Sequence, residues 1–532
     1  MSTRYWWILR IAALGMVIAT MGWLTVGTDG IFVSPDESAN AFFSQTFAET
    51  GSMLVSESLN AVAQGVIHPR STIAPGTALL PTSFLGFPFV TGVLRYTFGP
   101  FGQFAFTPIV AASGVAALWW MVRRLTKDER LADCSAFFVL IHPAFWYYGA
   151  RVMMPNVAFV SLLVIGVACF VLASIKRSFL FGFLAGAIVA IALTMRLVEA
   201  PIVMIVAMVA MIAYRKLLPW KAMCGAVVAG AMVLGAYLVA NSAVYGSALT
   251  TGYTLPDARS VVETTASSTS VLTEIGRLLL PFGFHPRAIV ANAFRYGFLL
   301  YPLLSALAVI GAYFAWTTKE HQKAWRTFVV CLVVASLWMV VVYGSWSIAD
   351  NPDPKAITIG NSHVRYWLPL FVAASVLAGL AFFRIRERMT HGLRSTVGSI
   401  ALIVIIITTS VQTVFLGPDG LLSARAAAIA SIEKRTSVLE HTESDAVVIV
   451  DRADKYLFPH RRVIVPLRAD STYAAMPVLA PIVPLYYFGI TFPESDLTYL
   501  NEIKLAELGL MIEPVTTVHD ETLYRITARD RE

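Results

Sequence analysis

Residues 154–174 read MPNVAFVSLLVIGVACFVLAS, a run of 21 residues without a charged side chain. An α-helix rises 1.5 Å per residue, so a helix over this stretch would be about 30 Å long. That length matches the hydrocarbon core of a lipid bilayer. The stretch therefore predicts a helix that crosses a membrane.

Other stretches share this length and apolar character. With the first, the windows lie near residues 5–27, 76–98, 102–122, 131–149, 154–174, 179–195, 200–214, 222–244, 292–315, 327–346, 366–383 and 396–416. The first window is too long for the apolar core of a signal peptide, so we expect it to be retained as the first membrane helix.

The window at 76–98 differs from the others in its many helix breakers. It follows Pro75 and contains Gly76, Pro81, Gly86, Pro88 and Gly92. Such residues do not favour a continuous helix. We therefore expect this segment to be re-entrant or tilted, which predicts about eleven net crossings of the membrane.

Charge is distributed unevenly along the chain. Hydrophobic residues make up 57% of the 532 residues and charged residues 14%, whereas a soluble protein has roughly 25% charged residues. Residues 417–532 hold 17 acidic and 12 basic side chains, a net charge of −5, and residues 1–416 carry a net charge of +12. We expect an all-α polytopic membrane domain over 1–416. The positive total reflects Lys and Arg at helix ends and does not indicate a nucleic-acid partner.

The C-terminal segment, residues 417–532, has the pattern of an α/β domain. Short apolar runs typical of strands lie at 446–451, 462–466, 485–490, 509–512 and 522–527, and patterns typical of helices lie at 421–440 and 496–508. We expect a water-soluble domain here.

The Lys and Arg residues between the windows assign the two sides of the membrane. Sixteen fall on the side of Arg123 and Arg130, and eight fall on the opposite side. The eight are Arg70, Arg151, Arg196, Arg259, Arg277, Arg287, Lys355 and Arg365. Cytoplasmic loops carry the excess of basic residues. Segments 28–75, 245–290 and 347–364 and the C-terminal domain are therefore predicted to lie outside the cytoplasm.

The first outer loop contains the sequence Ser34-Pro35-Asp36-Glu37. Ser before Pro, with Glu three positions after Ser, is typical of a capping box at a helix N-terminus. The helix 36–50 would place Phe42, Phe43 and Phe47 on one face and end at Gly51, so we expect it to lie along the membrane surface. Capping accounts for Ser34 and Glu37 but less well for Asp36, which is therefore a candidate for chemistry.

This Asp-Glu pair, followed by a helix ending in FAETGS (47–52), resembles the GT-C glycosyltransferases. It is most similar to the dolichyl-phosphate-mannose–protein mannosyltransferases and their bacterial relatives that use polyprenyl phosphate sugars. Further similar motifs, in the same order, are HPAFWYYGARVMMPNVA (142–158), ALTMRLVEAP (192–201), YGSALTTGYT (245–254) and HVRYWLPLF (363–371). The resemblance implies a GT-C-like membrane domain in which Asp36 is catalytic and Glu37 stands beside it.

The chain departs from the family at two positions. Asn156 stands where the family has an acid, and IAPGTALLP (73–81) stands where it has a Lys-Pro-Pro-Leu-like element. The second acid and the lysine are therefore missing or moved. Arg70 and Arg151 are candidates to supply the lost positive charge.

Outer arginines suit the phosphate of a polyprenyl donor because the planar guanidinium grips two phosphate oxygens. We expect Arg70, Arg151, Arg196 and Arg365 to bind the donor phosphate. An arginine that only extends to the interface is the alternative for the last three, and an ion pair with Glu199 is a further alternative for Arg196.

The sequence does not indicate a zinc or iron–sulfur site. Its four cysteines lie in apolar runs, and its Cys and His residues do not have the spacing of metal-binding motifs. Asp36 at a helix N-terminus is suited to orienting an acceptor or to binding a divalent cation. No cofactor is otherwise indicated.

The sequence therefore predicts a membrane glycosyltransferase that moves a sugar from a polyprenyl-phosphate donor to an extracytoplasmic acceptor. The alternative is a transporter or flippase of lipid-linked sugars, which would need the same outer arginines and a lipid groove. Transporters usually carry acidic groups deep within their helices, and few are visible in these windows.

Overall fold

The computed structural model describes residues 3–255, 280–348, 350, 353, 356–389 and 392–529. Arg259, Arg277 and Lys355, counted above on the outer side, lie outside the described residues. The chain forms two compact units. The helical unit contains Met1–Leu24, Phe104–Tyr237 and Thr265–Ala424, and the mixed unit contains Thr25–Gln103, Leu238–Thr264 and Arg425–Glu532.

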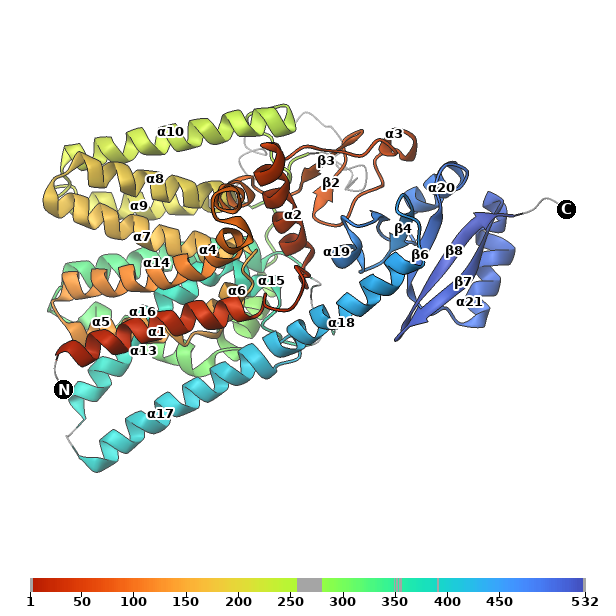
Figure 1. The fold of residues 1–532 in the computed structure, drawn as a ribbon. Helices are drawn as coiled ribbons and strands as arrows, with labels where there is room; N and C mark the ends of the chain where they lie inside the picture. The colour runs from red at the N-terminus through yellow and green to blue at the C-terminus, as the bar shows by residue number, and fades with distance from the viewer. Residues whose placement is uncertain are drawn as a thin grey trace. The chain divides into compact units, whose positions relative to one another are not determined.

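The helical unit is a bundle of apolar helices (Figure 1). Its helices are α1 (Thr3–Trp23), α5 (Glu129–Leu140), α6 (Pro143–Ala150), α7 (Pro155–Lys176), α8 (Phe179–Met195), η1 (Leu197–Glu199), α9 (Ala200–Tyr214), α12 (Pro286–Asn292), η2 (Ala293–Leu299), α13 (Pro302–Thr317), α14 (Gln322–Gly344), α15 (Ser362–Tyr366), α16 (Leu368–Arg388), α17 (Leu393–Val411) and η3 (Gln412–Leu416). The helices α4 (Gly86–Thr126), α10 (Trp220–Tyr245) and α18 (Leu421–Glu440) each contain residues of both units.

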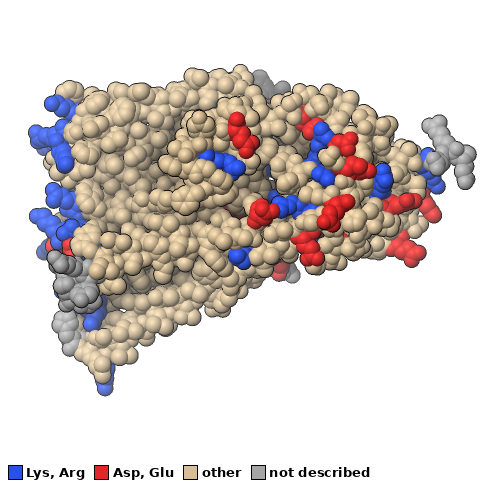
Figure 2. Space-filling view, in the orientation of Figure 1, with Lys and Arg blue, Asp and Glu red and all other residues tan. Residues whose placement is uncertain are grey.

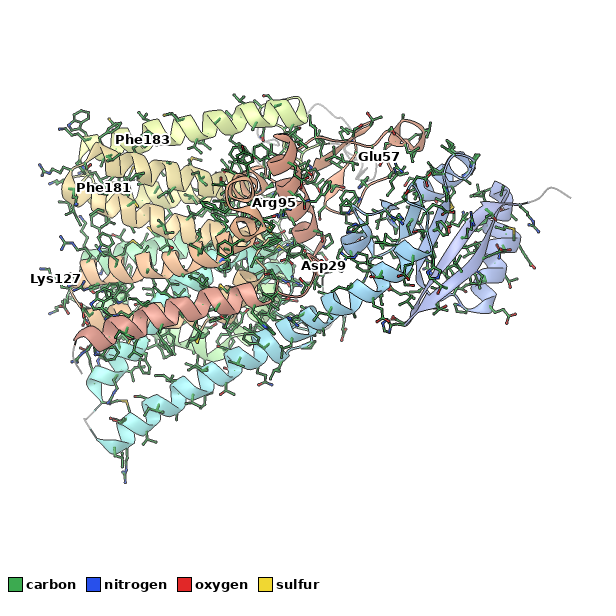
Figure 3. The ribbon with its side chains drawn as sticks, viewed as in Figure 1. Asp29, Glu57, Arg95, Lys127, Phe181 and Phe183 are labelled. Carbon is green, nitrogen blue, oxygen red and sulfur yellow. The ribbon has the colours of Figure 1, made fainter. Side chains whose placement is uncertain are left out.

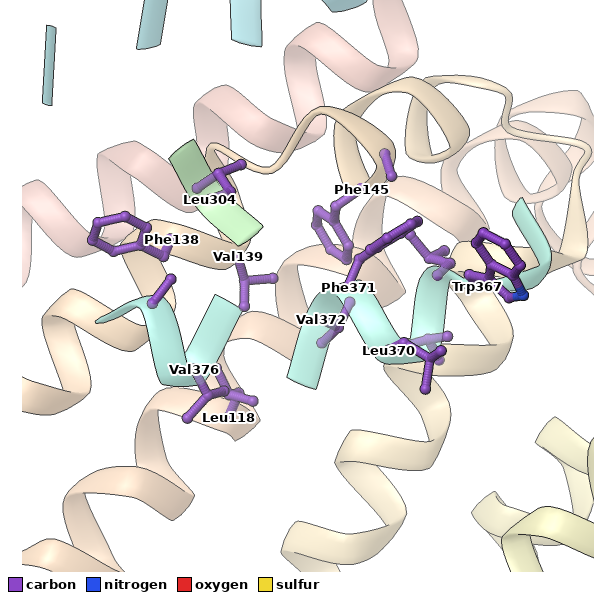
Figure 4. Packing of buried hydrophobic residues seen from close by; sticks show 14 of the residues in the cluster. Leu118, Phe138, Val139, Phe145, Leu304, Trp367, Leu370, Phe371, Val372 and Val376 are labelled. Carbon is purple, nitrogen blue, oxygen red and sulfur yellow. The ribbon is translucent and has the colours of Figure 1, made fainter. Parts of the chain in front are cut away.

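The core of the helical unit centres on α16. Buried side chains of α16, such as Phe371 and Val372, pack with Phe145 of α6 and Val139 of α5 (Figure 4). Twelve of the 21 residues of α16 are buried. A helix that is apolar and buried on most of its faces belongs in the middle of a bundle, whereas α9 and α10 have largely exposed apolar faces suited to lipid.

Eight helices among the described residues are long and apolar enough to cross a membrane, or nine if one bent pair counts as a single span. The chain is therefore an integral membrane protein, as predicted. The apolar helix α8 has 17 residues and falls just below this length. The count of eleven crossings stays a prediction.

Two windows predicted as single helices are broken, which corrects the sequence-based expectation. The window 131–149 is divided into α5 and α6 by Ile141 and His142, and α6 begins at Pro143. The window 292–315 contains a 98° bend between the segment ending at Leu299 and the helix starting at Pro302. Proline lacks an N–H and clashes with the preceding turn, so each helix restarts at its proline.

The segment 76–98 is not a continuous helix, in agreement with its glycines and prolines. Residues Ala78–Pro81 form strand β3, and α4 begins only at Gly86. Within α4, Gly99 interrupts the helix with φ 67° and ψ −161°. Whether the segment is re-entrant stays a prediction.

Basic side chains gather at one end of the helical unit. Arg123 and Arg124 lie in the last turn of α4, Lys176 in that of α7, and Arg386 and Arg388 in that of α16. Figure 2 shows Lys and Arg gathered at one end of these helices, where Figure 3 labels Lys127. This distribution matches the asymmetry counted in the sequence.

The mixed unit contains the predicted α/β domain. Its five-stranded sheet has the order β5-β4-β6-β8-β7, with β5 (Arg462–Ile464), β4 (Val447–Val450) and β6 (Leu485–Ile490) parallel and β8 (Glu521–Ala528) and β7 (Leu510–Val518) antiparallel. The α18 helix, the short helices α19 (Asp454–Leu457), α20 (Asp470–Leu479) and α21 (Glu494–Tyr499), the π-helix η4 (Leu500–Lys504) and the 3-10 helix η5 (Ala506–Leu508) complete it. All five strands were predicted within a few residues except for the longer β7.

Residues 28–75, predicted as the first outer loop, belong to the same unit. This loop contributes α2 (Pro35–Thr50), α3 (Asn60–Ala63) and the strands β1 (Val55–Ser56) and β2 (Thr72–Ile73), which pair with β3 of the next segment in the order β1-β3-β2. An isolated antiparallel bridge joins Ile67 of this loop to Ile464 of β5. The loop thus packs directly on the C-terminal sheet, a contact that its place in the sequence does not suggest.

Candidate functional site

The first-loop carboxylates lie in the first turn of α2, where the helix N-terminus stabilises negative charge. Glu37 is buried, with 3% of its surface exposed. Asp36 is partly exposed, and its Oδ1 accepts a hydrogen bond of 2.6 Å from the hydroxyl of Ser71. Asp36 is therefore the more accessible carboxylate, and it is held in a fixed orientation.

The predicted capping box is not formed at the start of α2. Ser34 has the extended backbone of an N-cap residue, but its hydroxyl makes no capping hydrogen bond. Instead the Ser34 carbonyl accepts hydrogen bonds from the amide and the hydroxyl of Ser38, at 3.2 and 3.3 Å. The helix end at Gly51 is as predicted, with φ 71° and its amide bonded to the Phe47 carbonyl.

The aromatic face of α2 packs against protein within the mixed unit. The Phe42 ring lies 4.6 Å from the Phe458 ring, and the Phe47 ring lies 5.0 Å from the Phe89 ring. Phe43 is fully buried. The predicted position of α2 along a membrane surface stays a prediction.

Arg70 is held by the C-terminal domain. Its Nη2 lies 2.6 Å from Oδ1 of Asp454, and its backbone amide donates to Oδ2 of the same side chain at 3.0 Å. Asp454 is buried, with 1% of its surface exposed. A phosphate at Arg70 would have to compete with this buried carboxylate.

In the mixed unit, the motif 245–254 of the family resemblance contacts the end of the segment 73–81, where the chain departs from the family. The hydroxyl of Tyr245 donates to the carbonyls of Pro81 and Ser83, at 2.8 and 3.0 Å. A Cβ at Gly252 would come within 2.3 Å of the Pro81 carbonyl oxygen, so glycine allows the close approach there. The segment 245–254 thus supports the segment that stands in place of the Lys-Pro-Pro-Leu-like element.

In the helical unit, Arg151 and Arg365 both lie near α6. The Arg151 guanidinium is 5.0 Å from the Tyr147 ring, and both arginines act electrostatically on the neighbouring Tyr148. The Tyr148 hydroxyl, in turn, lies 3.1 Å from the carbonyl of Asn361. The two predicted phosphate ligands therefore belong to the same part of the helical unit, with Arg151 over Tyr147 and Arg365 over Tyr366.

Asn156 stands where the resemblance leads us to expect an acid, and its side-chain amide binds a backbone carbonyl. The Asn156 Nδ2 donates to the backbone carbonyl of Arg365 at 3.1 Å. An ionised carboxylate cannot donate such a bond. The amide at this position therefore holds the backbone that carries Arg365.

Arg196 forms the ion pair that was the alternative to phosphate binding. Its Nε donates to Oε1 of Glu199 at 3.0 Å, its Nη2 contacts the same oxygen, and the Tyr343 hydroxyl donates to it at 2.9 Å. Glu199 is buried, with 2% of its side chain exposed, and Arg196 is mostly covered, with 11% exposed. The guanidinium also lies 5.1 Å from the Tyr366 ring, which the Arg365 guanidinium approaches at 5.2 Å.

The predicted residues thus fall into two sets: Asp36, Glu37 and Arg70 in the mixed unit, and Arg151, Arg196 and Arg365 in the helical unit. Sequence reasoning missed Ser71 and Asp454, which bind Asp36 and Arg70, and Tyr343, which binds Glu199. No local motif marks these partners, because each lies far from its counterpart in the sequence.

Within the described part of the chain, no group of three or more His, Cys, Asp and Glu side chains is arranged to hold a metal ion.

Comparison with known proteins gives a likeness in fold. No family model matches the sequence, and no curated protein is significantly similar to it. Among solved structures, the chain is similar to ArnT from Cupriavidus metallidurans in the apo state, with a TM-score of 0.54, and to the same protein bound to undecaprenyl phosphate, with a TM-score of 0.52. In both cases 98% of each chain is covered at 14% sequence identity. The likeness covers the predicted architecture, a polytopic helical domain followed by a C-terminal α/β domain, and that fold class is confirmed.

Proposed function

We propose that this chain is a membrane glycosyltransferase that moves a sugar from a polyprenyl-phosphate donor to an acceptor outside the cytoplasm. The observation that carries the proposal is the likeness in fold to ArnT over 98% of both chains, because one of the ArnT structures holds undecaprenyl phosphate. The first-loop carboxylate and the outer arginines provide the chemistry that such a transfer requires.

Asp36 is the proposed catalytic carboxylate. The acceptor oxygen bonds to the anomeric carbon of the sugar while the bond from that carbon to the phosphate oxygen breaks. The acceptor proton passes to Asp36 or, oriented by Asp36, to the departing phosphate. Asp36 lies at a helix N-terminus and accepts a hydrogen bond from Ser71, and both features suit a carboxylate that orients the acceptor.

Arg151 and Arg365 are the proposed ligands of the donor phosphate. Negative charge develops on the phosphate as it departs, and preorganised cationic donors stabilise it. Arg70 and Arg196 could join them only by exchanging a buried carboxylate, Asp454 or Glu199, for the phosphate. We therefore expect Arg70 and Arg196 to contribute less to donor binding than Arg151 and Arg365.

The proposal places residues 417–532 and the first outer loop outside the cytoplasm as one extracytoplasmic assembly. The polyprenyl chain of the donor would stay in the lipid bilayer. The sugar, which can be a hexose or a pentose, and the acceptor, which can be a lipid, a glycan or a protein, are for experiment to identify.

The test uses the full-length protein purified in detergent and mixed with undecaprenyl-phosphate sugars. Mass spectrometry of the lipid fraction should detect release of undecaprenyl phosphate that depends on the protein and on an added acceptor extract. Comparing glycolipids and glycoproteins from cells with and without the protein would identify the product.

A different result would favour the alternative. If the purified protein left every donor intact, but proteoliposomes carried the lipid-linked sugar from one leaflet to the other, the protein would be a flippase.

A further inference from the structure

The two neighbouring residues Arg70 and Ser71 join the C-terminal domain to the proposed catalytic carboxylate. Asp454 binds Arg70 twice, through the guanidinium at 2.6 Å and through the backbone amide at 3.0 Å. The next residue, Ser71, donates its hydroxyl to Asp36 at 2.6 Å. All four residues belong to the mixed unit. A continuous chain of short contacts therefore links Asp454 to Asp36.

The backbone at Ser71 requires such a restraint. Ser71 has φ 58°, in the left-handed region that residues with a side chain rarely adopt. A conformation of this kind persists only where its surroundings fix it. The bond from Asp454 to the amide of Arg70 fixes the backbone immediately before Ser71, which aims the Ser71 hydroxyl at Asp36.

The segment that carries Asp454 also contacts α2 directly. The Nζ of Lys455 donates to the Val33 carbonyl at 2.8 Å, and the hydroxyl of Ser38 donates to the Lys455 carbonyl at 3.3 Å. These contacts lie on either side of Asp36 in the sequence. The short helix α19 thus contacts the start of α2 at two points.

We propose that the C-terminal domain completes the active site, and that Asp454 is a positioning residue that orients Asp36 through Arg70 and Ser71. The inference rests on the proposed function for its catalytic consequence, and on the contacts above for its geometry. It gives the C-terminal domain a role in the transfer step itself.

A purely adhesive role for Asp454 is the competing explanation, and the chain offers a matched control. Glu57 of the same loop forms a second ion pair with the C-terminal domain, to Nε of Arg462 at 3.0 Å. Among the described residues, the Glu57 carboxylate contacts Arg462 and the backbone amide of Leu59, and not Asp36 or Ser71. Glu57→Gln should weaken adhesion without disturbing Asp36.

The experiment measures kcat and KM for the undecaprenyl-phosphate sugar with purified full-length variants. Asp454→Ala should lower kcat by about 10- to 100-fold with little change in KM, because a small misplacement of a reacting group has a cost of this order. Asp454→Asn should restore much of the loss, since its oxygen still accepts from the Arg70 amide. Ser71→Ala should resemble Asp454→Ala, and Glu57→Gln should stay near the parental rate.

A mutant cycle separates positioning from adhesion. In an Asp36→Asn background, Asp454→Ala should lower kcat no further, because the residue that it positions has already lost its charge. Equal losses in both backgrounds, or an equal loss from Glu57→Gln, would overturn the proposal.

A second measurement does not depend on sugar transfer. A water-soluble carbodiimide modifies exposed carboxylates, and mass spectrometry gives the rate at Asp36. Asp454→Ala and Ser71→Ala should both raise that rate relative to Glu57→Gln. Unchanged rates would refute the positioning role, whereas raised rates in a protein that transfers no sugar would refute the proposed function alone.

Discussion

Asp36 and Glu37 are neighbours in sequence, but the structure gives them different environments. Asp36 is partly exposed and Glu37 is buried. We expect Asp36→Asn to lower sugar transfer by about 10²–10⁴-fold, the usual contribution of a single acid–base group. The substitution preserves size and one hydrogen-bond acceptor for Ser71, so the protein should still fold and reach the membrane. Product formation by the purified variant measures the effect.

Glu37→Gln is the matched comparison for that variant. It removes one charge from the same helix turn while keeping the shape of a buried side chain, and its loss of activity should be smaller. If both variants transferred sugar at the parental rate, Asp36 would not be the catalytic residue.

Arg196 should matter more for stability than for donor binding. Its removal in Arg196→Met leaves Glu199 as a buried, uncompensated charge, and breaking a buried pair costs about 3–5 kcal/mol. We expect a clear fall in the thermal unfolding temperature measured in detergent. The double variant with Glu199→Gln should recover most of the loss. A single variant as stable as the parent would contradict the ion-pair interpretation.

Arg365, in contrast to Arg196, should matter more for donor binding than for stability. Arg365→Lys keeps the charge but loses the guanidinium fork. If one charge-assisted hydrogen bond to phosphate is lost, at about 1.5 kcal/mol, the KM for the donor should rise about tenfold. Kinetics at varied donor concentration tests this expectation, and an unchanged KM would remove Arg365 from the phosphate site.

Local sequence predicted those interactions whose partners are close along the chain. Arg196 and Glu199 are one turn apart, so their ion pair was a visible alternative. Asp454 and Arg70 are separated by 384 positions, and no single-sequence pattern marks so distant a pair. The partners of Asp36 and Arg70 therefore required the structure.

At the scale of elements, proline and glycine account for both the successes and the errors. The interruption of the segment 76–98, which forms β3 before α4 begins at Gly86, was expected from its glycines and prolines, whereas the break at Gly99 was not. The breaks at Pro143 and Pro302 were missed because the surrounding windows are apolar overall, and mean hydropathy does not reveal a change in the direction of a helix axis. A bent helix and a straight one can have the same composition.

Gly99 gives a direct test of the break in α4. Its φ of 67° and ψ of −161° fall in a region that is essentially restricted to glycine, and a side chain there costs roughly 1–3 kcal/mol. A Cβ would meet no atom within 4 Å, so any cost is one of backbone strain. Gly99→Ala should therefore lower the unfolding temperature in detergent.

Gly15 of α1 supplies the control. It also has open space for a Cβ, but it lies inside a regular helix, where alanine is favoured over glycine. Gly15→Ala should leave stability unchanged or raise it slightly. Equal effects of the two substitutions would show that the conformation of Gly99 is not restrictive.

The C-terminal sheet should respond to acid through Glu443. The Tyr486 hydroxyl donates to Glu443 at 2.7 Å, and this bond lowers the pKa of Glu443 below its ordinary value. Because the pKa of Glu443 is lower in the folded protein than in the unfolded chain, where it is near 4.3, its ionisation stabilises the folded state at pH values above 4.3. This stabilisation is lost as the pH falls through the pKa of Glu443 in the folded protein. The effect should be small because the carboxylate is largely exposed.

Hydrogen exchange of strands β6 and β8, compared between the parent and Glu443→Gln, measures this contribution. The parent should be better protected near pH 7, and the two proteins should converge below about pH 4. Glu440→Gln, an exposed change in the neighbouring helix α18, serves as the control. A difference that persisted at low pH would have a cause other than this hydrogen bond.

At the scale of the whole molecule, the compact units do not follow the order of the sequence. The first outer loop and the C-terminal domain, separated by most of the membrane helices, belong to one unit. Composition identified residues 417–532 as water-facing, but it could not reveal that residues 25–103 pack with them. That association depends on contacts such as Arg70–Asp454 and Glu57–Arg462, which only the folded chain brings together.

This shared unit sharpens the prediction of membrane topology. Since the first loop and the C-terminal domain pack together, they must lie on the same side of the membrane. The sixteen-to-eight count of basic residues predicts that this side is the extracytoplasmic one. Single cysteines at the exposed positions Ser58, Ser444 and Arg124, in a background without the four native cysteines, can be treated with an impermeant maleimide on intact cells. We expect labelling of Ser58→Cys and Ser444→Cys, and labelling of Arg124→Cys only after the membrane is opened. Labelling of Arg124→Cys alone on intact cells would invert the orientation and place Asp36 in the cytoplasm, where the proposed extracytoplasmic transfer could not take place.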